Sequence, residues 1–330
     1  MTAKVTIGER IVSLRRWRVR LASLLPLVLY CQPAYVMMAG KAPDSPAGRV
    51  DANSSLAFAS VGSVVVSGAA YSGVAVAPRF VLTASHVAAA PAAKIQFVLN
   101  AGGDRTSVIQ AAAVTPYPTA AFPNDDLALI ELATPLPAGI PIYPLMRQSI
   151  AVGCRITLVG YGASGNGDIG VTVDATSTVK RIGENTVDSI QTTMDGGAHN
   201  SLFYLFDFDA PTGNGPSGST TLGNAVETML AGGDSGSPAF AIDDGSYRLV
   251  GINTFIASSE KVPNGFGTRG GGVLLTRPEF LQWIDATTRF TAPSDDYNVD
   301  APTLPQWALI AGVFLMSLLL VRRPGRRHGA

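Results

Sequence analysis

The sequence predicts an all-β protein, and three observations support this fold class. Short apolar runs rich in β-branched residues recur through residues 54–290, as in "VGSVVVSG" and "DLALIEL". The 35 glycines and 22 prolines of the chain suit tight turns between such strands. No long stretch of this region shows the period of a helix. The pattern indicates an antiparallel barrel or sandwich and does not choose between the two.

Nine segments are expected to contain the strands: "VGSVVVSG", "GVAVAPRFVLTA", "KIQFVLNA", "DLALIEL", "RITLVGYG", "SLFYLFDF", "SPAFAI", "YRLVGINTFIA" and "GGVLLT". The Gly-, Ser- and Thr-rich part from Gly162 to Gly223 is expected to form extended surface loops around the strand "FYLFDFD". One helix is expected at "TRPEFLQWIDATT", because Pro278 stands just inside its start. Its apolar face consists of Phe280, Trp283 and Ile284.

Both ends of the chain are expected to lie outside this domain. Residues 1–39 have the pattern of a signal peptide, with arginines before the apolar core "LASLLPLVLY" and a cleavage site near Ala39. An uncleaved membrane anchor is the alternative interpretation. Residues 40–53 form a short N-terminal segment, and residues 291–303 form a linker. Residues 304–330 hold the apolar run "WALIAGVFLMSLLLV" and a basic tail, which is typical of a transmembrane helix.

The composition argues against several classes of partner. The formal net charge is zero and charged residues make up 15% of the chain, so nucleic acid is not an expected partner. The two cysteines, Cys31 and Cys154, offer no disulfide framework, and Cys154 is interpreted as a small buried hydrophobic residue. We expect no cofactor and no metal. The acidic residues of "FDFD" are interpreted as strand residues facing solvent rather than as calcium ligands.

The stretch "GGDSGSPAF" places Ser235 on a tight turn that leads into a strand. Gly233 and Gly236 permit backbone angles that other residues avoid. A nucleophile suits such a turn, because backbone N–H groups there can point at one spot beside the hydroxyl. A serine hydroxyl is a weak nucleophile and needs a base within hydrogen-bond reach.

Three histidines could supply that base. His86 follows a predicted strand in "FVLTASHVAAA", whereas His199 lies in a predicted loop and His328 in the basic tail. The acid that orients the base should be buried. In "NDDLALIEL", Asp126 adjoins the strand and is the better candidate, while Asp125 is interpreted as a solvated turn residue. A simple acidic turn is the alternative interpretation of both.

Six segments resemble, in order, the landmark segments of the chymotrypsin/trypsin-like serine proteases: "FVLTASHV", "NDDLALIEL", "GYG", "GGDSGSPAF", "LVGINTF" and "GGVLLTRPEFLQWI". The resemblance covers about residues 54–290, and the order His, Asp, Ser is that of this family. It implies two six-stranded antiparallel β-barrels followed by a C-terminal helix. It also implies a serine endopeptidase acting on a protein or peptide substrate through an acyl-enzyme.

The resemblance assigns roles to individual residues. It implies a catalytic triad of His86, Asp126 and Ser235. The backbone N–H groups of Gly233 and Ser235 would form the oxyanion hole.

The resemblance also implies four substrate-binding residues. Thr254 would pair its backbone with an extended substrate. Met229 would form the base of the primary pocket, with Ile256 and Gly272 on its walls. Because Met229 is not acidic, we expect cleavage after a small or medium apolar residue.

The sequence departs from the family at two places. Ser237 replaces the second glycine of the serine motif. Family zymogens are cut before Ile-Val-Gly-Gly, and the new amine pairs with the acid beside the serine, here Asp234. The only candidate terminus is Val50, which follows Arg49. A catalytically inactive trypsin-fold surface binding protein is therefore the alternative function, and a serine esterase is a third.

The C-terminal pattern "APTLPQWALI…LLLVRRPGRR" resembles the C-terminal sorting signals of Gram-negative bacteria that are related to PEP-CTERM and whose motif reads Ile-Pro-Thr-Leu. In this chain Ala301 stands where the Ile would be. The resemblance implies signal peptidase and an exosortase-type sorting enzyme as partners. It also implies export to the cell envelope or cell surface. There the protein would be anchored in the membrane by the C-terminal helix or released after sorting.

Overall fold

The computed structural model describes residues 37–39, 58–101, 104–192, 201–211, 213, 215, 217–218, 220–257 and 262–292. All of them belong to the compact unit Pro33–Ala330. No helix among these residues is long and apolar enough to cross a membrane. The predictions for Cys31, Val50, His199, Ala301 and His328, for most of the signal peptide and for residues 304–330 lie outside the described residues.

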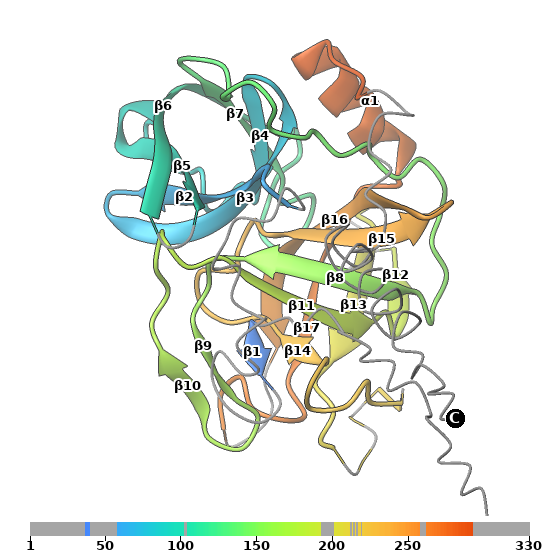
Figure 1. Ribbon diagram of the computed structural model, residues 1–330. Coiled ribbons are helices and arrows are strands. Elements are labelled where there is room, and N and C mark those ends of the chain that lie inside the picture. Colours follow the sequence, from blue (N-terminus) through green and yellow to red (C-terminus); the bar gives the residue numbers. More distant parts are fainter. Residues whose placement is uncertain are drawn as a thin grey trace, which may run out of the picture. The chain divides into compact units, whose positions relative to one another are not determined.

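The first part of the described chain is a closed barrel with strand order β2-β3-β4-β7-β6-β5, which confirms the first predicted barrel (Figure 1). Every neighbouring pair is antiparallel. Apolar side chains such as Val64, Val81 and Phe97 fill the barrel and are buried. The strands are β2 (Val61–Val66), β3 (Ala69–Ala77), β4 (Phe80–Thr83), β5 (Ile95–Ala101), β6 (Asp104–Pro116) and β7 (Ala128–Leu132), with a short 3-10 helix, η2 (Ala92–Lys94), before β5.

The second half differs from the predicted six-stranded barrel. Within the described residues it is a seven-stranded antiparallel sheet of order β11-β8-β15-β16-β17-β13-β12, without closure. Five of its strands, β8, β13, β15, β16 and β17, coincide with or overlap the five predicted segments from "RITLVGYG" to "GGVLLT". The strands are β8 (Arg155–Gly160), β11 (Arg181–Thr186), β12 (Ser189–Gln191), β13 (Phe203–Asp207), β15 (Pro238–Asp243), β16 (Ser246–Ala257) and β17 (Arg269–Leu274).

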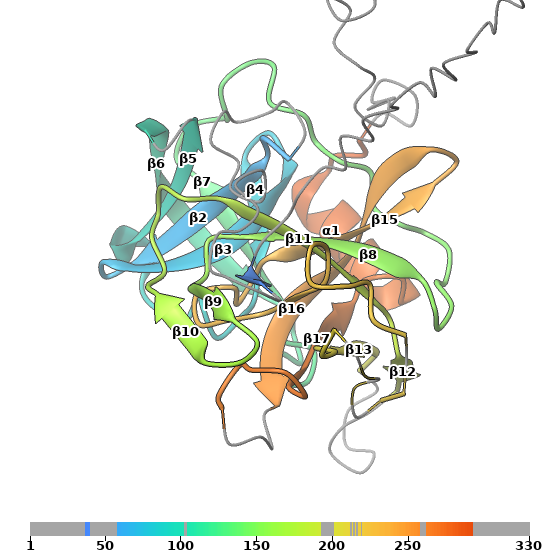
Figure 2. The same cartoon turned by 60° about the horizontal axis from the view of Figure 1, so that its bottom comes forward.

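A small sheet of order β10-β9-β1-β14 lies beside the seven-stranded sheet (Figure 2). Its strands are β1 (Met38–Ala39), β9 (Ser164–Asn166), β10 (Gly170–Val173) and β14 (Thr228–Met229). Strand β1 pairs antiparallel with β14 and parallel with β9. Met37, Met38 and Ala39 have no exposed surface. The predicted end of the signal peptide at Ala39 therefore falls in a buried strand.

The part from Gly162 to Gly223, predicted to be surface loops, contains β9 to β13 and several buried polar residues. Arg181, Glu184 and Asn185 are each at most 9% exposed. Asn185 Nδ2 donates to the carbonyls of Asp207 and Thr228, and the guanidinium of Arg155 pairs with Glu184. Polar residues can be buried where such partners exist, and apolar patterning does not reveal them.

The expectation that the acidic residues of "FDFD" face solvent is wrong. Asp207 is 1% and Asp209 is 2% exposed. Asp207 accepts a hydrogen bond from the Ser217 N–H, and the Asp209 N–H donates to Glu227. The described residues contain no group of three or more His, Cys, Asp or Glu side chains arranged to hold a metal.

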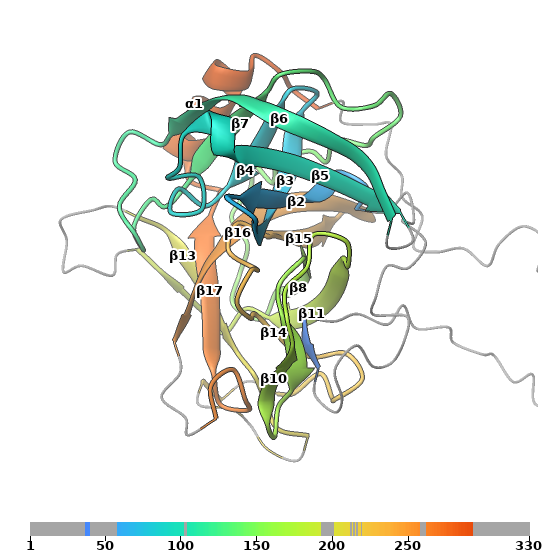
Figure 3. The same ribbon diagram turned by 90° about the vertical axis from the view of Figure 1, so that its left-hand side faces the viewer.

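Helix α1 (Pro278–Thr288) confirms the predicted helix. Phe280 and Ile284 are buried in a core that also contains Val61 and Leu129 of the barrel and Phe240 of the sheet. Because one core joins barrel, sheet and helix, the two halves pack directly on each other (Figure 3). The thiol of Cys154 is free and half-buried, and burial raises its pKa.

Candidate active site

His86 and Asp126 form a close pair at the edge of the barrel. The distance between His86 Nδ1 and Asp126 Oδ2 is 2.6 Å, and the His86 backbone N–H donates to Asp126 Oδ1 at 2.9 Å. The Asp126 side chain is 1% exposed, whereas the His86 side chain is 31% exposed. The bond at Nδ1 orients the ring, the backbone bond holds the carboxylate beside it, and Nε2 is the ring nitrogen that remains for proton transfer.

Ser235 lies on the turn before β15, and backbone bonds hold this turn in shape. Gly233 and Gly236 have φ of 95° and 82°, which favour glycine. The Gly236 N–H donates to the Asn253 carbonyl at 2.8 Å, and the Ser237 N–H donates to the Asp234 carbonyl at 2.9 Å. The Ser237 hydroxyl, at the position that departs from the family, accepts a bond from Asn253 Nδ2.

Ser72 of β3 connects this turn to the barrel, and no sequence pattern had indicated this role. Its N–H donates to the Ser235 carbonyl at 3.1 Å, and its hydroxyl donates to the Gly233 carbonyl at 2.9 Å. The hydroxyl also accepts from the Tyr161 N–H. Ser72 is fully buried, so water does not compete for the hydrogen bonds through which the barrel holds the serine turn.

Asp234 is a buried carboxylate whose described partners are backbone groups. Its Oδ1 accepts from the Gly162 N–H at 2.8 Å, and its Oδ2 accepts from the Ala231 N–H at 2.9 Å. The buried Arg181 guanidinium donates to the Gly162 carbonyl, on the other side of the same residue. Val50, the terminus considered from the sequence, is not among the described residues.

Burial raises the pKa of the Asp234 carboxyl from 3.8 to about 7, while bonds from Ala231 and Gly162 and the charge of Arg181 act against this shift. The folded state therefore holds the proton more tightly than the unfolded chain. This tighter proton binding stabilises the folded state fully at pH values below the pKa of Asp234 in the unfolded chain. The stabilisation is lost as the pH rises through the pKa of Asp234 in the folded state.

We expect the unfolding free energy of the wild-type protein to fall relative to that of Asp234→Asn as the pH rises from about 4 to about 7. A shift of this size corresponds to about 4 kcal/mol. Urea titrations of both proteins across this range, at constant ionic strength, measure the difference. Parallel pH profiles of the two proteins would contradict the prediction.

A pocket of about 480 Å³ contains both His86 and Ser235 in its lining. Its walls are mostly apolar and include Leu230, Phe255 and Ile256. Phe122, which the sequence analysis did not single out, also lines it, is 59% exposed and meets the His86 ring edge to face at 5.2 Å. The residues around Phe122, just before "NDDLALIEL", form no pattern that would have indicated a place in the pocket.

The structure brings some of the sequence-predicted substrate residues to this pocket. Thr254 and Ile256 line it. Met229 has no exposed surface and pairs with Met38 in the small sheet. Gly272 is buried in β17, where a Cβ atom would lie 2.0 Å from the Ile252 carbonyl oxygen. Neither Met229 nor Gly272 is among the residues that line this pocket.

A closed β-barrel packed on a second β-sheet, with a His–Asp pair and a serine turn on one pocket, is the arrangement of a β-barrel serine hydrolase. The family model Trypsin matches residues 52–273, which is most of the chain. The chain therefore belongs to the trypsin family of serine proteases, and its domain is that of a serine-type peptidase. A comparison with curated proteins gave no match.

Proposed function

We propose that the protein is an active serine endopeptidase that uses His86, Asp126 and Ser235. The trypsin domain supports this, and one observation carries it. The ring of His86 is bonded to Asp126 through Nδ1 and lines the same pocket as Ser235. A base oriented by a buried acid beside a serine on a rigid turn is what activation of a hydroxyl requires.

The proposed reaction begins when Ser235 Oγ attacks the substrate carbonyl carbon and its proton passes to His86 Nε2. Asp126 accepts the Nδ1–H bond and stabilises the charged ring. Among the described residues, the backbone N–H groups of Gly233 and Ser235 have no hydrogen-bond acceptor. Both N–H groups are therefore available to bind an oxyanion. His86 then protonates the leaving amine, and water hydrolyses the acyl-enzyme by the same steps.

Covalent labelling of the full-length protein tests this proposal. We expect one fluorophosphonate adduct by intact mass, located on Ser235 by peptide mapping, together with cleavage of an unfolded protein substrate. A labelled protein that cleaves esters but no peptide bond would support the esterase instead. A folded protein without any adduct would overturn the proposal in favour of the inactive binding protein.

We propose a preference for a small or medium apolar residue before the scissile bond. Leu230, Phe255 and Ile256 line the pocket. The residue that the family resemblance assigns to the base of the primary pocket is Met229, which carries no negative charge. A basic substrate side chain would lose hydration there without gaining a counter-charge. We expect nitroanilide peptides ending in Ala or Val to react at least about tenfold faster than those ending in Arg. Faster cleavage after Arg would contradict this.

We further propose export to the cell surface, through the N-terminal signal and the C-terminal sorting pattern. Because Met37, Met38 and Ala39 are buried in the fold, we expect the mature chain to retain them and to begin at or before Met37. N-terminal sequencing of protein from the cell envelope checks both points. A mature terminus after Ala39, in a labelled and folded protein, would show that β1 is dispensable.

A further inference from the structure

Asp125, the neighbour of Asp126, is a buried carboxylate that the proposed chemistry does not use. The residue is 2% exposed, so the expectation of a solvated turn residue is wrong. Its φ of 49° lies in the left-handed region, which is costly for a residue with a side chain. Such a backbone persists only where the surroundings hold it.

One residue of its own loop and two residues from other parts of the fold hold the Asp125 carboxylate. Oδ2 accepts from Thr119 Oγ1 at 2.5 Å, and Oδ1 accepts from Ser201 Oγ at 2.6 Å. Oδ1 also pairs with Arg277 Nη1 at 3.2 Å. The Asp125 N–H donates back to the Ser201 hydroxyl at 3.0 Å. The carboxylate therefore ties its own loop to the segment before β13 and to the residue that precedes α1.

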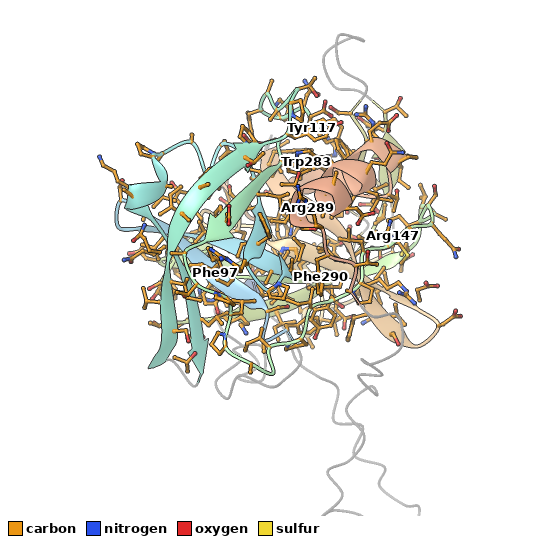
Figure 4. All side chains as sticks on the ribbon, turned by 90° about the horizontal axis from the view of Figure 1, so that it is seen from above. Phe97, Tyr117, Arg147, Trp283, Arg289 and Phe290 are labelled. Carbon is orange, nitrogen blue, oxygen red and sulfur yellow. The ribbon has the colours of Figure 1, made fainter. Side chains whose placement is uncertain are left out.

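Arg277 is itself fixed at the start of α1. Its side chain is 16% exposed, its Nε donates to Glu279 at 2.9 Å, and its guanidinium lies 4.8 Å from the Phe280 ring centre. Tyr117, at the other end of the loop, packs edge to face against Phe280 and Trp283 of the helix (Figure 4). The start of the helix therefore contacts the loop at two points, Asp125 and Tyr117.

The same loop carries the acid that orients His86. Asp126 follows Asp125 directly, and the Leu127 N–H donates across it to the Asp125 carbonyl at 2.7 Å. A change of backbone angle at Asp125 therefore moves the Asp126 carboxylate relative to His86 Nδ1, which lies only 2.6 Å away. Misplacement of a catalytic group by about 1 Å can cost about a hundredfold in rate.

We infer that Asp125 is a positioning residue, which together with Arg277 holds Asp126 against His86. It acts through Asp126 and does not line the substrate pocket described above. The inference rests on the proposed function, because it concerns the geometry of the same site. In this arrangement the start of α1 and the segment before β13 help to determine the reactivity of Ser235.

The test compares Arg277→Gln and Asp125→Asn with the wild-type full-length protein. The first readout is the maximal rate of fluorophosphonate labelling, kinact, separated from the probe's binding constant. We expect kinact to fall about tenfold or more in both variants, with the binding constant unchanged. Arg277→Lys, which keeps the charge, should recover part of the rate. The second readout is the downfield proton resonance of His86 Nδ1–H, which should shift or broaden in both variants.

Arg147→Gln is the matched control. Arg147 (labelled in Figure 4) also pairs with an acid of α1, Asp285, through two bonds of 2.9 and 3.0 Å, but near the C-terminal end of the helix, whereas Arg277 precedes its start. Arg147→Gln should lower the stability of α1 without changing kinact or the His86 proton resonance. If Arg277→Gln does not fold, Ser201→Ala, which removes both bonds between the Ser201 hydroxyl and Asp125, replaces it in the test.

The outcomes separate the two proposals. Wild-type rate and resonance in both variants, or the same losses in Arg147→Gln, would overturn the positioning role and leave the proposed function intact. A wild-type protein that takes no label would refute the proposed function. The proton resonance would then decide the positioning role by itself: a change in Arg277→Gln and Asp125→Asn alone supports it, and no change overturns it.

Discussion

Replacing Ser235 with alanine is expected to lower kcat/KM for a peptide substrate by about 10⁶-fold, because no other group could form the acyl-enzyme. His86→Ala should cost about as much, since Ser235 without its base is a weak nucleophile. Asp126→Asn should cost about 10⁴-fold by favouring the wrong ring tautomer. Initial rates on a nitroanilide peptide, corrected by active-site titration, measure all three.

The double variant and a control make this result specific. Residues that act as one unit are not additive, so Ser235→Ala combined with His86→Ala should be no slower than either single variant. Ser149→Ala, an exposed serine on a loop, should keep full activity and labelling. Activity in Ser235→Ala above about a hundredth of the wild-type level would place the nucleophile elsewhere.

Gly162→Ala is expected to displace the serine turn and abolish most of the activity. A Cβ atom at this position would lie 2.3 Å from Asp234 Cγ and Oδ2, inside the fully buried site. The Gly162 N–H is bonded to Asp234 at 2.8 Å, so neither group can move without breaking that bond. We expect the unfolding free energy to fall by about 1–3 kcal/mol. The labelling rate should fall by about a hundredfold or more.

Gly213→Ala provides the matched glycine control. A Cβ atom there meets nothing within 4 Å, and its φ is not in the left-handed region. Urea titration and labelling of both variants compare their effects on stability and on Ser235. A Gly162→Ala protein with wild-type labelling would mean that the Asp234 contact does not hold the serine turn in its reactive shape.

Local patterns predicted much of this fold. Helix α1 and five strands of the barrel, β2, β3, β4, β5 and β7, coincide with or overlap predicted apolar or amphipathic segments. The sixth barrel strand, β6, lies outside every predicted segment. In place of the predicted second six-stranded barrel, the described residues form a seven-stranded sheet that is not closed, because closure depends on which edges meet rather than on strand pattern. Strand β11 was missed, because Arg181, Glu184 and Asn185 are polar and are buried by partners distant in sequence.

The candidate site shows the same division. His86 and Ser235 were singled out because each lies in a motif whose residue types suit one chemistry. The preference for Asp126 over Asp125 came from its proximity to a strand, yet both carboxylates are buried. Two partners of Asp125 are distant in the sequence: Ser201 lies 76 residues away and Arg277 lies 152 residues away. No local pattern indicates that they meet.

The sequence by itself predicted the apolar strands, the helix and the candidate residues of the proposed chemistry, since these depend on periodicity and on short motifs. Only the tertiary structure decided how the barrel closes, what surrounds Asp234, and why β1 belongs to the fold. Strand β1 meets β14 about 190 residues later, through the bond from Thr228 Oγ1 to the Met38 carbonyl. Such contacts arise when buried polar groups find partners in the packed core, and that pairing is a property of the whole chain.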